Sequence, residues 1–484
     1  MSTVRHQDVA NAIALACAIA GFCAPAHAVN IDPQGRGQVL LYPYYTVNSG
    51  QDTYFSVSNP TVYAQVAHVR FLEGRAGRPA LDLDVHLTAY DSWSAAISQV
   101  SDAGGARLTT ADASCTRPAI PATGLAFTAS GYDGSGALAA DSGPHDLTRT
   151  REGFVEVIES AAVEFAEGGT VLTAFPFEIP PIDCATIFSS IVGHIGVIGG
   201  GLTGSAAIIK VADGIYYPYL PTAIDNFTSV PLYTETMSPL QPSLQQANSD
   251  TGAGGHLVAN VFGENASFGT LVTPYALQFD TGIDAVSAVL MADSLQNDYL
   301  IEPGLGASTD WVLTFPTRRF YQDPIYPGYN DGANSGVGLF ERSDAAFYDT
   351  EGNRLTVDEE TIRPPYSTNV ISFLRGAAAG ARSGVFGSSL TRNYAPPANA
   401  GTMRLDVERH RTGLGGTSGQ GLHSLQVSGF GAGLYGFPVV GFMAYNIVNA
   451  NAAPGKLANY SGTFAHRTTA CFAQTYLDPA ICFR

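Results

Sequence analysis

A nine-residue stretch of strict alternation constrains the fold more than any other part of the sequence. Apolar residues occupy every odd position and polar residues every even one, in the order Leu81, Asp82, Leu83, Asp84, Val85, His86, Leu87, Thr88 and Ala89. A period of two residues places successive side chains on opposite faces of a β-strand. We therefore predict a strand with its leucine and valine side in a core and its aspartate and histidine side in water.

Other segments favour the same kind of structure. Alternation recurs over residues 403–407 and 311–315, and residues 53–58 and 65–72 form a series of strand, turn and strand ahead of Leu81. The chain contains 53 glycines and 28 prolines and only 14% charged residues, which favours short strands and many turns. We predict a mainly β protein made of two or more antiparallel β-sandwich domains of the immunoglobulin-like sort with long loops, although no Cys-Trp-Cys framework accompanies them.

The length of the chain predicts more than one domain. Residues 238–255 carry Pro239, Pro242 and a polar Gln-Gln-Ala-Asn-Ser-Asp tract, which is typical of a boundary. The sequence is therefore divided into a signal peptide over 1–28, an N-terminal β-sandwich region over 29–237, a linker over 238–255 and a C-terminal β-rich region over 256–484.

The N-terminus predicts export. Arg5 supplies a positive charge, residues 9–22 are apolar and uncharged, and Ala26-His27-Ala28 resembles a cleavage site, so cleavage is predicted after Ala28. A lipid on Cys17 is the alternative, but Ala14 stands where a large aliphatic residue is expected. Export places the mature protein at the cell surface or in the extracellular medium, with the periplasm also open.

Four cysteines remain after the predicted cleavage: Cys115, Cys184, Cys471 and Cys482. An even number in an exported chain predicts two disulfide bonds, with three connectivities to choose from. Proximity in the sequence favours Cys471 with Cys482, and hence Cys115 with Cys184. A metal site is the alternative, but none of the four forms a CxxC pair.

Charge and hydropathy exclude some classes of partner. The formal net charge of −18 opposes binding to nucleic acid. The most apolar window, residues 187–211, is interrupted by His194, Lys210 and several glycines, so no transmembrane helix is expected. An outer-membrane β-barrel is an alternative because length, acidity and tyrosine content resemble porins. Two disulfides, too few alternating segments and the Cys482-Phe483-Arg484 ending oppose it.

Motif by motif, the sequence assigns no catalytic residue and no cofactor. Gly199, Gly201 and Gly204 fit a GxGxxG pattern, but β-forming residues follow within about ten positions, so we interpret it as a glycine-rich turn between strands. GxSxG is absent and the histidines are scattered singly.

Two loops hold hard oxygen ligands around a glycine, as calcium loops do. Their candidate ligands are Asp349, Glu351 and Asn353 in one loop and Asp331 and Asn334 in the other. Neither loop completes the EF-hand spacing, and such sequences are ordinary turns elsewhere. Turn chemistry is the prediction, and calcium is the alternative.

Several segments resemble an uncharacterised family of exported or cell-surface proteins of Gram-negative bacteria. They are residues 37–40, 42–47, 69–74, 204–209 and 309–317. The resemblance implies an envelope or extracellular location and carries no catalytic residues across.

Together these observations predict an exported structural, adhesive or other interaction protein without catalytic activity. A protein or surface glycan partner and self-assembly are both compatible with the sequence. A secreted hydrolase with a motif-free active site is the alternative from another class, besides the outer-membrane barrel.

Overall fold

A computed structural model of the chain gives the fold. It describes residues 28–101, 104–163, 165–167, 170–172, 184–191, 195–196, 198–248, 256–264, 272–326, 343–356, 361–362, 364–375, 380–407, 424–426, 433–449, 453, 456 and 458–473. The predicted signal peptide lies outside the described residues except for Ala28.

The N-terminal half forms two antiparallel sheets. The first, called the N-inner sheet, has the order β1-β16-β2-β10-β4-β5-β8 with β13 beside β10. Its strands are β1 (Asn30–Ile31), β16 (Thr222–Asp225), β2 (Val39–Thr46), β10 (Glu152–Val163), β4 (Ala64–Glu73), β5 (Pro79–Leu87), β8 (Thr116–Arg117) and β13 (Ile195–Gly196). The second, called the N-outer sheet, runs β15 (Ile215–Tyr219), β14 (Thr203–Lys210), β3 (Asp52–Ser58), β6 (Ser92–Gln99), β7 (Ala106–Thr109) and β9 (Leu125–Ala126).

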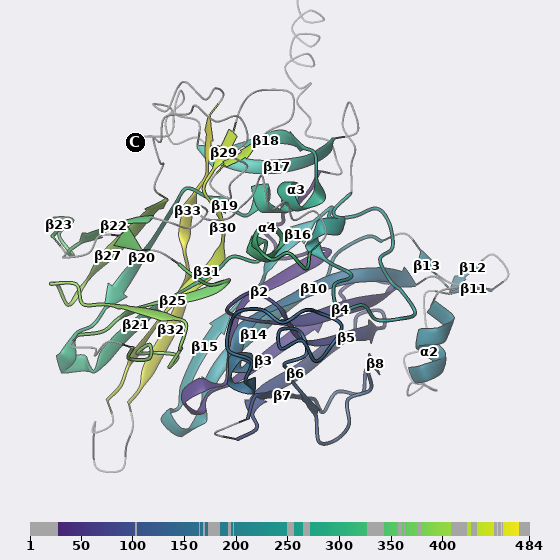
Figure 1. Cartoon of the computed structure of the whole chain (residues 1–484), viewed down its shortest axis with the longest axis horizontal. Coiled ribbons are helices and arrows are strands. Elements are labelled where there is room, and N and C mark those ends of the chain that lie inside the picture. The colour runs from purple at the N-terminus through teal and green to yellow at the C-terminus, as the bar shows by residue number, and fades with distance from the viewer. Residues whose placement is uncertain are drawn as a thin grey trace, which may run out of the picture.

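The C-terminal half forms two further large sheets. The C-inner sheet runs β26 (Thr391–Tyr394), β25 (Thr368–Phe373), β21 (Ala307–Thr314), β31 (Val440–Ile447) and β32 (Tyr460–Ala465). The C-outer sheet runs β23 (Arg354–Leu355), β22 (Ser343–Tyr348), β27 (Ala400–Val407), β20 (Ser294–Leu300) and β33 (Arg467–Thr469), with β24 (Thr361–Ile362) beside β22. In Figure 1 these green and yellow strands lie to one side of the purple and blue strands of the N-terminal sheets.

Smaller elements complete the described structure. The small sheets are the pairs β11 (Phe165–Glu167) with β12 (Thr170–Leu172), β17 (Leu257–Glu264) with β18 (Val272–Phe279) and β19 (Met291–Ala292) with β30 (Phe437–Pro438), and the three strands β28 (Ser424–Gln426), β29 (Gly433–Tyr435) and β34 (Cys471–Ala473). The described α-helices are α2 (Cys184–Ile191), α3 (Gly282–Val289) and α4 (Arg318–Gln322). The described 3₁₀ turns are η1 (Asn48–Gly50), η2 (Leu147–Arg151), η3 (Val211–Asp213), η4 (Leu244–Gln246) and η6 (Pro303–Leu305). No helix within the described ranges is both long enough and apolar enough to cross a membrane.

The prediction of a mainly β, antiparallel architecture is confirmed. Among the described strands every pairing is antiparallel except that of β25 with β26. The predicted strand over Leu81–Ala89 corresponds to β5, and those around residues 311–315 and 403–407 correspond to β21 and β27. The finer comparison with immunoglobulin domains stays a prediction.

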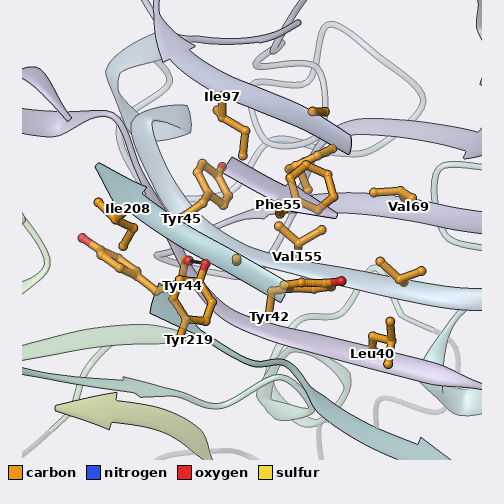
Figure 2. Close-up of a cluster of buried hydrophobic side chains, with 14 of the residues drawn as sticks. Leu40, Tyr42, Tyr44, Tyr45, Phe55, Val69, Ile97, Val155, Ile208 and Tyr219 are labelled. Carbon is orange, nitrogen blue, oxygen red and sulfur yellow. Dashed lines mark hydrogen bonds between the residues drawn. The ribbon is translucent and has the colours of Figure 1, made fainter. Parts of the chain in front are cut away.

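A large aromatic core fills the space between the two N-terminal sheets. Its members include Tyr42, Phe55, Val69, Val155 and Ile208, which point into one space in Figure 2. On β3 the residues alternate between buried and more exposed, so one face of this strand enters the core. Aromatic rings meet edge to face, as between Phe55 and Phe71 with centroids 5.5 Å apart, a geometry that ring quadrupoles favour.

The C-inner sheet contributes to two cores because both of its faces are covered. Val312 and Phe442 pack with the N-terminal aromatic core, where Phe442 stacks on Tyr219 with ring centroids 4.7 Å apart. Trp311 and Leu313 point to the other side, into a core shared with the C-outer sheet. Adjacent residues of β21 therefore pack into two different cores, and this strand joins the N-terminal sheets to the C-terminal sheets.

The polar face of β5 is buried, so the prediction that this face lies in water is wrong. Asp84 and His86 are each 3% exposed. Asp82 receives a hydrogen bond from Arg70 at 2.5 Å, and Asp84 bonds Nδ1 of His68 at 2.8 Å. Charged groups can be buried when each finds a partner of opposite charge, and for Asp82 and Asp84 the neighbouring strand β4 supplies that partner.

Segment 234–242 covers this charged face. Arg117 donates to the carbonyl oxygens of Thr234 and Glu235 at 2.8 and 2.7 Å, and Arg70 donates to that of Pro242 at 2.6 Å. The guanidinium groups of Arg70 and Arg117 therefore donate hydrogen bonds to carbonyl groups of segment 234–242 as well as to carboxylates of the N-inner sheet.

The described part of the predicted linker, residues 238–248, is packed against the rest of the protein. Leu244 is fully buried in a core that also contains α3. Named strands before residue 238 pair only with one another in the described structure, and those after 255 do likewise. Val29 and Ala259 form an isolated bridge between the halves. The boundary itself stays a prediction.

The disulfide pairing Cys115 with Cys184 is confirmed. The bond ties the segment before β8, at the edge of the N-inner sheet, to the start of α2. Cys471 begins β34, whereas Cys482 lies outside the described residues, so the second predicted disulfide stays a prediction.

Candidate functional site

A cavity of about 600 Å³ opens where the two halves meet. It is bounded by the β4–β5 turn, residues 140–149, α4 and residues 365–367. Five arginines line it: Arg75, Arg78, Arg149, Arg318 and Arg319. The whole chain has only 24 lysines and arginines and a net charge of −18. This concentration of positive charge in an acidic protein makes the cavity the leading candidate site.

The buried carboxylate of Glu73 shapes the β4–β5 turn that carries two of these arginines. Glu73 is fully buried and accepts hydrogen bonds from the backbone N–H groups of Arg75, Ala76 and Arg78 at 2.7, 2.9 and 3.1 Å. Gly77 completes the turn with a φ of +72°, a region that glycine enters without steric cost. The turn therefore holds Arg75 and Arg78 in fixed positions.

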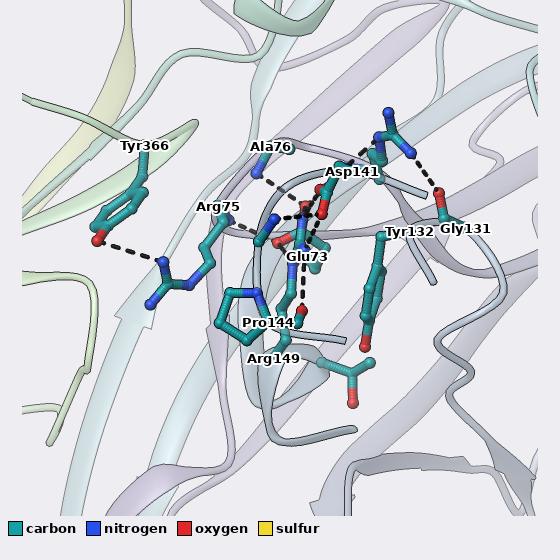
Figure 3. A network of polar contacts seen from close by, with 12 residues as sticks. Glu73, Arg75, Ala76, Gly131, Tyr132, Asp141, Pro144, Arg149 and Tyr366 are labelled. Atoms are coloured by element: carbon teal, nitrogen blue, oxygen red, sulfur yellow. Dashed lines mark hydrogen bonds and ion pairs between the residues drawn. The ribbon is translucent and has the colours of Figure 1, made fainter. Parts of the chain in front are cut away.

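Arg149 lies behind the turn and is held by carboxylates on two sides (Figure 3). It donates to Glu73 at 2.7 and 2.9 Å and to Asp141 at 2.8 and 2.5 Å. Burial alone would lower the pKa of Arg149, but Asp141 and Glu73 outweigh burial and raise it. The charge of this arginine is fully matched.

Two further arginines join the halves. Arg78 forms a two-pronged pair with Asp323, at 2.6 and 2.9 Å, and Asp323 follows directly after α4. Arg319 donates from Nη2 to Glu156 on β10 at 2.6 Å. These pairs match planar guanidinium groups to carboxylates across the joint.

Arg75 differs from these three because it forms no ion pair with any described residue. It is half-buried, lies over the ring of Tyr366 at 4.9 Å and approaches the Tyr366 hydroxyl at 3.5 Å. Figure 3 shows its side chain directed toward Tyr366, away from the cluster of Glu73 and Asp141. Its charge is available to a ligand.

Arg318 contacts the backbone of the same tyrosine. It donates to Oε1 of Gln322 at 2.5 Å and to the carbonyl oxygens of Pro364 and Tyr366 at 3.0 and 2.7 Å. Burial lowers the pKa of Arg318 to about 9. A nearby anion would favour its charged form.

The lining also contains two buried donors whose hydrogen-bonding capacity is unused in the described structure. Ser367 is 1% exposed and its Oγ has no hydrogen-bond partner, and Arg319 is 2% exposed and its Nε has none. A buried donor without an acceptor costs about 1–3 kcal/mol. Both groups line the cavity, where a ligand can supply the missing acceptor.

The charges of the cavity favour an anion. Asp141 and Asp323 belong to the lining, and Glu73 and Glu156 lie behind it, so four carboxylates face five guanidinium groups. Among these described residues, the guanidinium groups outnumber the carboxylates by one. Arginine suits this task because its charge persists and its fork of donors matches oxyanions.

The calcium candidates that the structure describes form a turn. Oδ1 of Asp349 accepts hydrogen bonds from the backbone N–H groups of Glu351 and Asn353 at 3.0 and 2.8 Å, and Asn353 is also bound through its side chain. Asp331 and Asn334 lie outside the described residues. Within the described ranges, no group of three or more histidine, cysteine, aspartate or glutamate side chains is placed to hold a metal ion.

Gly199 and Gly201 of the GxGxxG pattern lie in a turn between β13 and β14, as predicted, and Gly204 lies in β14. This turn binds a carboxylate of the protein itself. Gly200 and Gly201 have φ values of +73° and +96°, and the N–H of Gly200 donates to Oε2 of Glu159 at 2.8 Å. Burial raises the pKa of Glu159 to about 7. The backbone donors that hold phosphate in a nucleotide site are used here by a side chain.

Sequence reasoning missed the arginine cavity because its members come from four distant segments. One signal was present: no arginine occurs between Arg151 and Arg318, and the Arg318-Arg319 pair ends this gap. An arginine pair after so long an interval without arginine indicates a local function for the pair.

Comparison of the chain with models of protein families, with curated proteins and with solved structures found no match in any of the three. The resemblance to an exported bacterial family therefore stays a prediction.

Proposed function

We propose that this chain is an exported interaction protein, without catalytic activity, that recognises an anionic partner through the arginine-lined cavity at the cell surface or outside the cell. The observation that carries the proposal is the cavity with five arginines in a chain of net charge −18. The predicted signal peptide and the Cys115–Cys184 disulfide support a location outside the cytosol, since disulfides persist in oxidising compartments.

Overall charge and local charge act differently on such a partner. The acidic surface repels anions in general, so non-specific attraction is weak at low salt. Binding that does occur should therefore depend on the cavity. The lining surrounds such a ligand with arginines of both halves, Arg75 and Arg78 from the first and Arg318 and Arg319 from the second.

Calorimetric titration of the full exported chain tests the proposal. The probes are glucose 6-phosphate, glucose 6-sulfate and glucuronate, with glucose as the uncharged control. We expect at least one anionic sugar to bind and glucose not to bind. A hydrogen bond to a charged group contributes about 1.5–3 kcal/mol, so Arg75→Ala should weaken binding by roughly ten- to a hundredfold.

Arg107→Ala is the matched control for Arg75→Ala. Arg107 is also half-buried and donates to one carbonyl oxygen, that of Thr123, on the N-outer sheet. Both variants change the net charge equally, so an equal loss of binding would attribute the effect to overall charge. That result, or no binding of any anionic sugar above glucose, would contradict the proposal.

A further inference from the structure

We infer that a second cavity of the protein binds an uncharged, largely apolar molecule that carries a hydrogen-bond donor, such as a fatty alcohol. This cavity has a volume of about 560 Å³ and shares no lining residue with the arginine cavity. The inference goes beyond the proposed function and does not depend on it. It rests on the absence of charge from the lining and on one buried acceptor that has no partner.

Elements of both halves surround this second cavity. Its walls come from β1 and β16 in the N-terminal half and from β17, α3, β19, β20, β31 and residues 465–470 in the C-terminal half. Several of these elements, among them β17, α3, β19 and β33, are labelled close together in the upper part of Figure 1. The backbone N–H of Asn260 on β17 donates to the carbonyl oxygen of Val29 at 2.8 Å, which ties one wall to the segment before β1. The fold therefore forms the cavity in advance, as is usual for ligand sites.

Most side chains of the lining are apolar. Val261, Met291, Leu295 and Val440 belong to it and are buried. Phe262 also belongs to it but is 52% exposed, so the cavity reaches the surface beside this ring. The volume lies within the range of about 300–1,000 Å³ that ligand sites occupy. Contact with apolar surface would supply most of the binding free energy.

The lining carries no charged side chain. It contains no lysine, arginine, aspartate or glutamate, in a chain that has 24 basic and 42 acidic residues. The imidazole of His466 also belongs to the lining. Its Nε2 donates to the carbonyl oxygen of Val312 at 3.0 Å, and its Nδ1 accepts from Nδ2 of Asn297 at 3.2 Å. The residue as a whole is half-buried, but desolvation of the ring lowers the pKa of His466 to about 4, so the ring is neutral at pH 7.

An anionic ligand is disfavoured in this cavity. Moving a carboxylate from water into apolar surroundings without a positive partner carries a large cost. Oδ1 of Asp293 accepts a hydrogen bond from Oγ1 of Thr469 at 2.6 Å, so a carboxylate of the protein lies directly behind the lining. This cavity therefore opposes the kind of ligand that we propose for the arginine cavity.

One polar atom decides which uncharged ligand fits. Asn260 lines the cavity, and its Oδ1 is buried and accepts no hydrogen bond in the described structure. A buried acceptor without a donor destabilises the folded protein, and a hydroxyl group of a ligand can supply the missing hydrogen bond. A fatty alcohol provides this donor at the end of an apolar chain and adds no charge.

Displacement of the uncharged fluorescent probe N-phenyl-1-naphthylamine from the full exported chain tests the inference. The competitors are 1-decanol, decanoate and methyl nonyl ether, which are similar in size and differ in charge and in the hydroxyl donor. We expect 1-decanol to displace the probe at a concentration about tenfold or more below that of decanoate, because the carboxylate must be desolvated. Its advantage over the ether should be about fivefold, because the ether cannot donate to Asn260.

Asn260→Leu and Asn393→Leu make a matched pair of variants. Asn393 is also half-buried and its Oδ1 is likewise buried without a partner, but it lies on β26 and outside the cavity lining. We expect Asn260→Leu to bind 1-decanol no better than the ether, and Asn393→Leu to keep the wild-type preference. Thermal unfolding of both variants checks that each is folded.

Two kinds of result would overturn the inference. One is that neither the probe nor 1-decanol binds, or that decanoate competes as well as 1-decanol does. The other is that folded Asn260→Leu keeps the preference for the alcohol over the ether. Neither result bears on the proposed function, which is tested by the anionic sugars and by Arg75→Ala.

Discussion

Apolar and polar side chains alternate along the strands of both N-terminal sheets, but the polar face is exposed in one sheet and buried in the other. In the N-outer sheet the face away from the core is exposed, with Tyr54 49% and Tyr216 53% accessible, and serine pairs such as Ser58 and Ser92 bond across strands at 2.7 Å. In the N-inner sheet β10 is buried along its whole length. Alternation in the sequence therefore predicts that a strand has one apolar and one polar face, but it does not predict whether the polar face is exposed to water.

The chemistry of the polar residues explains the difference. On the N-inner sheet, Glu156, Arg70 and Asp82 stand opposite one another on β10, β4 and β5, so opposite charges alternate across neighbouring strands. On the N-outer sheet the corresponding face carries mainly serine, threonine and alanine. Cross-strand charge pairs allow a polar face to be covered, and the arginine cavity continues this covered face through Glu156 and Arg319.

The largest expected effect comes from breaking the covered charge ladder. Arg70→Met removes the guanidinium partner of Asp82 and a donor to Pro242, so the buried carboxylates lose part of the positive charge that compensates them. We expect it to lower the free energy of unfolding by about 3–5 kcal/mol. The same change at Arg107, on the N-outer sheet, should cost less than about 0.5 kcal/mol. Urea denaturation measures both, and similar losses would remove the distinction between the sheets.

The disulfide provides the next largest effect. Replacing Cys115 and Cys184 together by alanine opens a loop between residues 69 positions apart and should lower stability by about 2–4 kcal/mol. Because the bond lies beside β8, hydrogen exchange should increase in β5 and β8 of the N-inner sheet and change little in β6 of the N-outer sheet. Equal increases in hydrogen exchange in both sheets would show that the disulfide does not specifically stabilise the β5–β8 edge of the N-inner sheet.

The pH dependence of stability gives a smaller and more specific effect. Burial raises the pKa of Glu159 on β10 to about 7, from an ordinary value of 4.5. Between these values the folded state keeps a proton that the unfolded state has lost, so this group makes stability fall as pH rises from 4.5 to 7, on the order of 3 kcal/mol at most.

Glu159→Gln isolates that contribution. Burial lowers the pKa of His86 to about 4, so this histidine acts in the opposite direction and raises stability between pH 4 and its ordinary 6.5. The difference between wild type and Glu159→Gln cancels the histidine contribution. Unfolding free energies measured at pH 5 and pH 7.5 should fall further in wild type than in the variant, and parallel changes in both would contradict the assignment to Glu159.

Much of the fold was predictable because it depends on local patterns. The alternation of Leu83, Val85 and Leu87 located β5 and its core face, and cysteine spacing gave the Cys115–Cys184 pair. The glycine-rich turn before β14 followed from the short distance to β-forming residues. The burial of Asp84 was not predictable, because its partner Arg117 is held by Thr234, which lies more than a hundred residues away in the sequence.

The candidate site was not predictable from local pattern. Its lining joins residues near positions 75, 141, 318 and 367, and no spacing rule connects these segments. The difference between Arg75 and Arg149 depends on which carboxylates the fold brings near each of them. Only tertiary structure distinguishes an arginine whose charge is matched from one that can receive a ligand.

The most direct test of the anion site is a crystal of the full exported chain soaked in tungstate, a tetrahedral oxyanion with a strong anomalous signal. We predict an anomalous peak inside the arginine cavity, within hydrogen-bond distance of Arg75, that is lost in Arg75→Ala crystals. An empty cavity at saturating tungstate, or a peak unaffected by Arg75→Ala, would contradict it.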